Sequence, residues 1–219
     1  MKPTSLLKKT LLLQAGLAFI PASVFGSFYL GGAALYVPEQ SSPIDFPISS
    51  IDSGDFESGI AYSLRGGYRF QDKLSLELEG HWYSTEANLQ GSAPNFGALT
   101  GKETITTKLL YVNLLYDLAS LFDETNWVIE LGGGIGYANL ENEIKLNAAA
   151  GSQSGSDSDG AFSWQVITNI GYKFTEKFTA GITMHAFSFE GYDWNIQGFD
   201  LSSDDFVASS FGAYAAFSF

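Results

Sequence analysis

The stretch IAYSLRGGYRFQDKLSLELEGHWY, residues 60–83, decides the fold. Apolar and polar side chains alternate along it, and only residues 71–73 interrupt the pattern. A period of two is that of a β-strand with one apolar and one polar face, so the stretch predicts two antiparallel strands joined by a tight turn. A three-residue turn would place Arg65 directly opposite Glu79. The apolar face carries Ile60, Tyr62, Leu64, Gly66, Tyr68, Phe70, Leu74, Leu76, Leu78, Gly80 and Trp82.

The same alternation returns in six further stretches, so the sequence predicts an all-β chain of eight antiparallel strands. The connections alternate between short and long, which brings all the long ones to one end, as in an up-and-down transmembrane β-barrel. Outside the first 26 residues, no apolar run approaches the roughly 20 residues of a membrane-spanning helix. The six further strands are 28–37, 106–118, 127–137, 162–174, 178–187 and 207–219. The short connections are 71–73, 119–126 and 175–177, and the long ones 38–59, 84–105, 138–161 and 188–206.

The third long connection contains the low-complexity segment GSQSGSDSDG, residues 151–160. Such a composition is typical of mobile segments, and we expect a mobile loop here. A linker between two domains is the alternative, but the strand pattern is the same on both sides of the segment. Neither half could close a barrel alone.

Aromatic residues gather at both ends of the apolar strand faces. A soluble barrel with an apolar interior would also alternate, but two rings of aromatics around aliphatic positions are typical of a barrel in a bilayer. The sequence therefore predicts a lipid-facing outer surface. One ring consists of Tyr68, Phe70, Tyr116, Trp127, Tyr172, Phe174 and Phe178, and the other of Tyr36, Tyr62, Trp82, Tyr137, Phe162 and Trp164.

The first 26 residues combine three lysines, an apolar run and small residues, the order of a secretory signal peptide. We expect cleavage after Gly26, which leaves residues 27–219 as one barrel domain. That domain has eight basic and 24 acidic side chains, a net charge of −16, which argues against nucleic acid as a partner. The chain has no cysteine, so closed hydrogen bonding and burial must stabilise it.

Three segments resemble strands of the small outer-membrane barrels related to the OmpA membrane domain, OmpX and the opacity-like surface antigens: SFYLGGAALY (27–36), LGGGIGY (131–137) and IGYKF (170–174). The resemblance implies an outer-membrane location in a Gram-negative-type bacterium. It also implies that Phe211, Phe217 and the final Phe219 form the terminal signal that the barrel-assembly machinery recognises. OmpA-like proteins that bind peptidoglycan continue past the barrel, so no cell-wall anchoring is expected.

Strand parity places seven charged side chains inside the barrel. Paired carboxylates on one face could suggest acid–base catalysis. An eight-stranded barrel, however, is only wide enough for side chains to fill it, so an ion network is favoured, with very small conductance and no cofactor. The predicted network consists of Arg65, Arg69, Glu77, Glu79, Asp117, Glu130 and Lys173.

The only histidines, His81 and His185, also point inward by parity. Lipid A deacylases of this barrel type use a His and a Ser two residues apart. Here Ser188 follows His185 by three residues, so a regular strand places the two on opposite faces. Omptin-like proteases need ten strands and pairs of acid and His residues at the rim, and neither is evident. The chain is therefore not expected to be an enzyme.

The long connections are acidic and also carry apolar residues. Asp200, Asp204 and Asp205 are weak candidates for a Ca²⁺ or Mg²⁺ site that could bridge to lipopolysaccharide phosphates, but a solvated acidic rim is favoured because no EF-hand spacing occurs. The apolar residues could pack together or contact another molecule. They are Ile44, Phe46, Ile48, Phe96, Tyr192, Trp194 and Phe199.

Three functions follow from these expectations. The favoured one is a structural, adhesive or surface-antigen barrel that acts through its loops, with outer-membrane lipid, lipopolysaccharide and a host or cell-surface ligand as partners. The second is a narrow channel or carrier for small or hydrophobic compounds. The third, least favoured, is a lipid A-modifying enzyme.

Overall fold

The computed structural model describes residues 26–40, 44–45, 51–71, 73–93, 97–121, 126–148, 151–196, 199–203 and 205–219. Residues 1–25, which form most of the predicted signal peptide, lie outside the described residues. That signal peptide and its cleavage site stay predictions. Among the described residues, no helix has the length and hydropathy to cross a bilayer.

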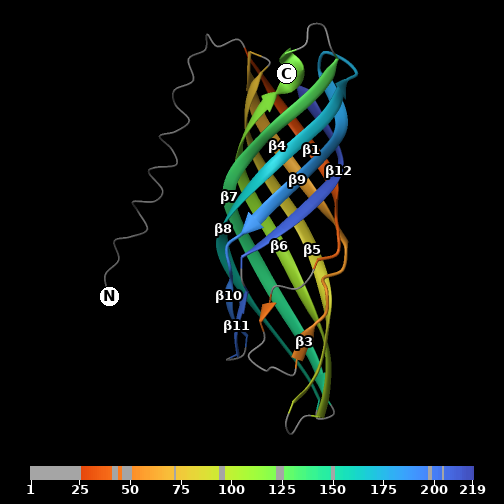
Figure 1. Ribbon diagram of the computed structural model, residues 1–219, viewed down its shortest axis with the longest axis vertical. Coiled ribbons are helices and arrows are strands. Elements are labelled where there is room, and N and C mark those ends of the chain that lie inside the picture. Colours follow the sequence, from red (N-terminus) through yellow and green to blue (C-terminus); the bar gives the residue numbers. More distant parts are fainter. Residues whose placement is uncertain are drawn as a thin grey trace, which may run out of the picture.

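Eight long strands form a closed ring in which each strand is antiparallel to its two neighbours (Figure 1). The last strand pairs with the first, so the ring has no free edge and the ladder hydrogen bonds continue around it. The predicted eight-stranded antiparallel barrel is confirmed. Its strands are β1 (Gly26–Val37), β4 (Gly59–Phe70), β5 (Leu74–Ala93), β6 (Gly97–Asp117), β7 (Trp127–Ala148), β8 (Gly151–Lys173), β9 (Phe178–Phe189) and β12 (Phe206–Ser218).

Short elements complete the fold. At the end of the barrel away from the C-terminus, β3 (Ile51–Ser53) pairs with β5. A small sheet joins β2 (Ile44–Asp45), β10 (Asp193–Ile196) and β11 (Phe199–Ser203). A 3-10 helix, η1 (Leu118–Leu121), lies in the connection from β6 to β7. We call the end with the C-terminus proximal and the opposite end distal (Figure 1).

The register between β4 and β5 is the one that a three-residue turn predicts. Arg65 lies opposite Glu79, and Arg69 lies opposite Ser75. Gln71 in the turn has a positive φ of 47°, the left-handed conformation that closes tight turns. The four charged side chains within the paired residues 62–70 and 74–82, which are Arg65, Arg69, Glu77 and Glu79, therefore fall on the same, inward face.

The prediction of long loops at residues 84–105 and 138–161 is wrong. Residues 84–93 pair with 97–106, and residues 138–148 pair with 151–161. The segment expected to be a mobile loop, 151–160, is a regular part of β8. Its low complexity does not prevent pairing, because β7 offers an unbroken partner whose inward Leu140 and Ile144 are buried. We call residues 84–93, 97–107, 138–148 and 151–161 the distal extension.

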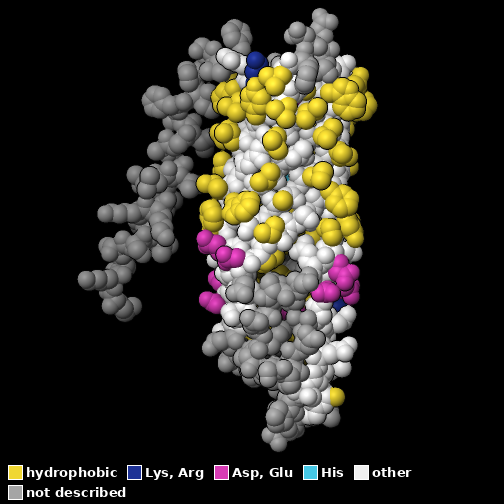
Figure 2. Space-filling view, in the orientation of Figure 1, with side chains coloured by type: hydrophobic (Ala, Val, Ile, Leu, Met, Phe, Trp, Pro, Cys, Tyr) yellow, Lys and Arg dark blue, Asp and Glu magenta, His cyan; other side chains and the backbone are white. Residues whose placement is uncertain are grey.

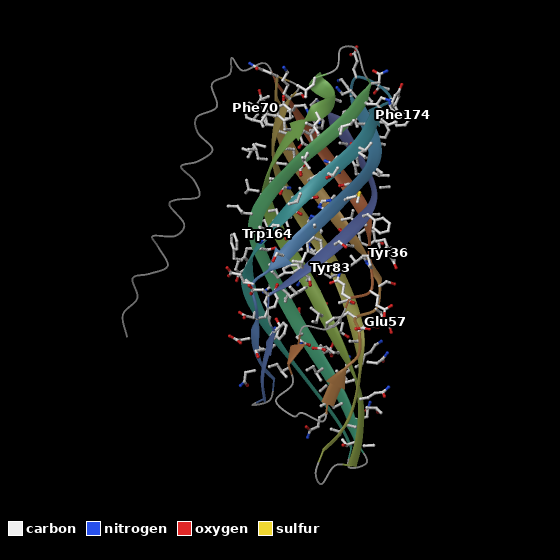
Figure 3. The ribbon with its side chains drawn as sticks, viewed as in Figure 1. Tyr36, Glu57, Phe70, Tyr83, Trp164 and Phe174 are labelled. Atoms are coloured by element: carbon white, nitrogen blue, oxygen red, sulfur yellow. The ribbon has the colours of Figure 1, made fainter. Side chains whose placement is uncertain are left out.

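The outer surface of the proximal half is apolar (Figure 2), and exposed aromatic side chains lie at both of its ends. Between the aromatic belts, Leu64, Leu78 and Val112 are 65%, 53% and 51% exposed, as lipid-facing side chains must be. Phe70 and Phe174 mark the proximal belt, whereas Tyr36 and Trp164 mark the distal belt (Figure 3). The two predicted belts are confirmed, and the distal extension begins where the second belt ends.

The barrel interior changes character along its axis. Between the belts it is polar, with buried Arg, Glu, Asn, Gln and His side chains. In the distal extension it becomes an apolar core built around large side chains. Glycines make room for the polar part: a Cβ atom added at inward-facing Gly134 would collide with the Asn113 side chain. The core includes Phe56, Leu89, Ile105, Leu109, Leu140, Ile144, Phe187, Phe189, Tyr192, Trp194 and Leu201.

Candidate functional site

A hydrogen-bonded network of carboxylates and amides crosses the lumen between the belts. Asn113 Nδ2 on β6 donates to Glu77 Oε1 and to Glu79 Oε2, both at 3.0 Å. Gln165 Nε2 on β8 donates to the same Glu79 oxygen at 3.2 Å. The Tyr29 hydroxyl on β1 donates to Glu77 Oε2 at 2.9 Å. Side chains from four strands thus meet in the middle of the barrel and fill it.

A second part of the network lies closer to the proximal mouth. Arg69 Nη2 pairs with Glu130 Oε1 at 2.6 Å, and Asn169 Nδ2 donates to Glu130 Oε2 at 2.8 Å. Arg65 donates to Asn169 Oδ1 at 3.4 Å and lies 4.5 Å from the centre of the Tyr214 ring. Among the described residues, the Arg65 Nε and Nη2 atoms have no hydrogen-bond partner.

The seven predicted interior charges occupy three environments. Arg65, Arg69, Glu77, Glu79 and Glu130 belong to the buried network. Asp117 accepts hydrogen bonds from the amides of Ala119 and Ile129, at 3.0 and 3.1 Å, and so holds the turn around η1. Lys173 is half-buried at the proximal mouth. The sequence reasoning missed the amides, Asn113, Gln165 and Asn169, although their inward parity on polar strand faces was a usable signal.

The two histidines meet inside the barrel. Their ring centroids are 5.1 Å apart with an interplanar angle of 82°, and His81 Nε2 lies 3.2 Å from Glu79 Oε2. His185 Nε2 lies 2.9 Å from Thr183 Oγ1, and His185 Nδ1 lies 3.2 Å from Gln165 Oε1. One ligand atom from each of Glu79, His81 and His185 lies within 4.8 Å of the other two.

The sequence predicted both histidines to point inward but did not bring them together. Their convergence depends on the ring, in which β5 and β9 are separated by three strands on either side. Ser188 is half-exposed whereas His185 is buried, so the predicted opposite faces are confirmed. The Glu79–His81 pair is enclosed in the lumen and not at a rim, where a substrate could reach it.

The distal end contains a small apolar pocket of about 30 Å³, room for roughly two water molecules. Buried Tyr192 and Trp194 line it, and their Oη and Nε1 atoms have no hydrogen-bond partner among the described residues. These two aromatics pack on each other, with ring centroids 5.6 Å apart. Of the two alternatives for the apolar residues of the long connections, packing together is the one that holds for this pair.

The distal extension also buries a carboxyl group. Glu103 is fully buried, and Asn142 Nδ2 donates to its Oε1 at 2.6 Å. Its Oε2 has no hydrogen-bond partner among the described residues. Burial raises the pKa of Glu103 to about 7, because an apolar environment disfavours the charged form.

Of the three weak candidates for a cation site, Asp200, Asp204 and Asp205, the structure describes the side chain of Asp205 alone. The side chain of Asp200 and the whole of Asp204 lie outside the described residues. Asp205 Oδ1 accepts a hydrogen bond from the Gly191 amide at 2.8 Å, which gives it a structural partner.

The terminal aromatics lie on the outer face. Phe211, Phe217 and Phe219 are 50%, 44% and 67% exposed. The Phe219 amide donates to the Phe28 carbonyl at 2.9 Å, and the rings of Phe217 and Phe219 are 5.4 Å apart. The last strand thus joins the first at the proximal belt, and its role as an assembly signal stays a prediction.

Comparison with solved structures shows the fold of small outer-membrane barrels. The chain is similar to OprG from Pseudomonas aeruginosa, with 13% identity over 90% of this chain and 97% of OprG and a TM-score of 0.56. Neisserial surface protein A matches with 12% identity over 88% of this chain and 97% of that one, at a TM-score of 0.43. Ail of Yersinia pestis, solved with the heparin analogue sucrose octasulfate, matches with 12% identity over 89% of this chain and 97% of Ail, at a TM-score of 0.39. The last two scores are too low to carry an argument.

No curated protein sequence matches this chain significantly. The sequence family described as outer membrane protein beta-barrel domain, in contrast, matches residues 10–219, nearly the whole chain. Together with the closed eight-stranded ring and its two aromatic belts, this match shows that the chain belongs to the outer membrane protein beta-barrel domain family and is an outer-membrane barrel of the Gram-negative type.

Proposed function

We propose that this chain is a non-catalytic surface barrel, with residues 27–219 as a single exported domain, whose distal extension offers an interaction surface outside the cell. The observation that carries the proposal is the length of β5 to β8, which have 20 to 23 residues each. A membrane strand needs only about 10. The excess projects as paired strands around an apolar core, so the projecting part is a folded platform.

The filled lumen supports a role other than conduction. Glu77, Glu79, Asn113 and Gln165 are each at most 2% exposed, and they bond across the barrel. An eight-stranded barrel has no room for an aqueous channel beside such side chains. We expect at most a very small conductance in planar bilayers, and a large stable channel would contradict this.

The outer face of the extension is polar and mixed in charge. Lys102 and Glu86 form an ion pair across β5 and β6, and Lys145 Nζ lies 2.9 Å from Glu143 Oε1 on β7. Such a water-facing surface suits polar contacts with another cell surface. The net charge of −16 for residues 27–219 disfavours a polyanion such as sulfated sugar as the ligand.

The test is attachment by bacteria that express a shortened extension. Asn88 and Lys102 are paired across the β5–β6 hairpin, so residues 89–101 can be replaced by an Asn-Gly turn that suits a two-residue hairpin. A second variant shortens the β7–β8 hairpin between the paired Ile144 and Gly155. Heat-modifiable migration on SDS gels checks that each barrel is folded.

We expect expression of the full-length chain to raise attachment to host cells or matrix several-fold, and at least one shortened variant to lose that gain. Equal attachment by full-length, shortened and non-expressing cells on every surface tested would contradict the proposal.

The distal pocket favours a second candidate, binding of a small hydrophobic compound. Its aromatic lining, and the two polar atoms on Tyr192 and Trp194 that have no hydrogen-bond partner in the described part of the chain, are features of ligand sites. At about 30 Å³ the pocket admits such a compound only if β10 and β11 move. Titration of the refolded barrel with N-phenylnaphthylamine should then give a saturable rise in dye fluorescence that Trp194→Ala reduces. A signal that stays equal in both proteins would exclude this site.

A further inference from the structure

We propose that Glu79, His81 and His185 bind a divalent transition-metal cation of the Zn²⁺ type inside the barrel, bridging β5 and β9 across the lumen. Two imidazoles and a carboxylate are a common protein ligand set for zinc and other first-row divalent ions. All three side chains are at most 2% exposed. The inference does not depend on the role of the distal extension.

The geometry needs little rearrangement. Ligand atoms about 2.1 Å from a tetrahedral ion are about 3.4 Å apart. His81 Nε2 and Glu79 Oε2 are already 3.2 Å apart, and the His185 ligand atom lies within 4.8 Å of both. A shift of the His185 ligand atom by at most about 1.4 Å, within reach of a side-chain rotation, therefore completes a three-ligand site.

The unsatisfied atoms at the cluster point to a missing partner. Glu79 Oε1 and His81 Nε2 are buried and make no hydrogen bond of acceptable geometry with any described residue. Buried polar atoms without a partner are costly, and native structures rarely leave them so. A cation bound by His81 Nε2 and the Glu79 carboxylate would satisfy both.

The surroundings resemble the outer shell of a metal site. His185 has Thr183 next to one ring nitrogen and Gln165 next to the other. Whichever nitrogen binds the ion, the remaining one keeps a partner that holds the ring in position. Asn113 and Gln165 both donate to Glu79 Oε2, the oxygen next to His81, and so hold the carboxylate in position.

The charge of the lumen favours a cation. Among the described residues, and apart from Glu103 in the distal extension, four interior carboxylates face three basic side chains, one of which is the half-buried Lys173 at the proximal mouth. Arg65 and Arg69 hold the other two positive charges. A divalent ion at Glu79 would offset the excess negative charge, which is expensive to bury alone. Because the imidazole ligands are nitrogen donors, Ca²⁺ and Mg²⁺ are disfavoured.

The experiment is metal binding by the refolded, tag-free full-length barrel. The barrel is refolded in detergent with equimolar Zn²⁺ or with chelator, dialysed, and its bound metal is measured by mass spectrometry. Co²⁺ replaces Zn²⁺ in a parallel sample, because its visible absorption reports coordination by nitrogen. We expect about one ion per folded chain and a Co²⁺ spectrum typical of imidazole ligands.

The variants separate this site from the acidic surface. His81→Gln and His185→Gln should each weaken Zn²⁺ binding more than tenfold. Glu77→Gln is the matched control, because Glu77 is also buried, faces the same way on the same strand and accepts a hydrogen bond from Asn113. Glu77 is outside the ligand set, so the affinity of this variant for Zn²⁺ should change only a few-fold.

Heat-modifiable migration on SDS gels shows that each variant is folded before its bound metal is measured. If a histidine variant fails to fold, the Co²⁺ spectrum of the wild-type barrel decides the question. Absence of bound metal in the folded wild type, or equal binding by the wild type and both histidine variants, would overturn the proposal.

Discussion

Asp157 Oδ2 accepts a hydrogen bond from the backbone amide of Asn195 at 2.8 Å. Two residues along β8, Asp159 Oδ2 accepts one from the amide of Asp193 at 3.1 Å. The two carboxylates share one face of β8 and occupy the positions of carbonyl acceptors along the edge of β10. They cover an edge that would otherwise be open to other strands, and thereby connect the low-complexity segment to the small sheet of β2, β10 and β11.

Replacement of Asp157 by Ala should loosen the β10–β11 hairpin without unfolding the barrel. The Asn195 amide loses this acceptor, so its hydrogen exchange should accelerate, whereas amides between the belts should keep their protection. Asp157→Asn is the control, because the side-chain amide retains an oxygen acceptor. Unchanged exchange at Asn195 in the Ala variant would show that the hairpin is held by other contacts.

The hydrogen bond between Asp157 and the Asn195 amide should also make the β10–β11 hairpin sensitive to acid. Hydrogen bonds from the backbone amides of Asn195 and Ser158 lower the pKa of Asp157 below its usual range. The ionised carboxylate thus stabilises docking above the ordinary aspartate pKa, and this contribution is lost as the pH falls through the lowered value. Exchange at Asn195 should accelerate there in the wild type but not in Asp157→Asn.

Glu103 predicts the opposite pH dependence in the same part of the molecule. Burial raises the pKa of Glu103 to about 7. Between the ordinary glutamate pKa and this raised value, Glu103 is therefore protonated in the folded chain and ionised in the unfolded chain. The free energy of unfolding should therefore be highest below the ordinary glutamate pKa and should fall as the pH rises through about 7, by roughly 3 kcal/mol.

Urea unfolding of the refolded barrel at about pH 5 and about pH 8 measures this effect. Glu103→Gln keeps an oxygen for Asn142 but does not ionise, so its stability should change less between the two pH values. An equal change in both proteins would assign the effect to other groups.

The fold was predictable because it depends on a local pattern that every strand repeats. Alternation of period two placed Arg65 opposite Glu79 and the aromatics in two outward belts, and both follow from parity and one turn. The distal extension was not predictable in this way. In residues 151–160, Ser, Gly and Asp replace the apolar alternation, and pairing there depends on β7 and on the backbone of β10. Likewise, His81 and His185 meet only because their strands are opposite in the ring.

Phe219 should matter for assembly in the cell more than for stability. Its side chain is 67% exposed on the outer face, so Phe219→Ala removes few internal contacts while its amide can still bond Phe28. Because the last strand resembles a terminal assembly signal, the amount of folded barrel in outer membranes should drop several-fold in this variant. Refolding in detergent, which needs no assembly machinery, should be nearly unchanged. Normal cellular assembly of the variant would contradict the signal.

Two positions on the same face of β6 distinguish lipid from water. Val112 lies between the belts and is 51% exposed, and Thr100 is exposed in the distal extension. Arginine at a lipid-facing midplane site costs about 2 to 4 kcal/mol, so Val112→Arg should lower the unfolding free energy of the refolded barrel in lipid vesicles by that amount. Thr100→Arg, which stays in water, should have little effect. Equal losses at the two sites would mean that the bilayer does not end at the distal belt, because only its position separates a lipid-facing residue from a water-facing one on this strand.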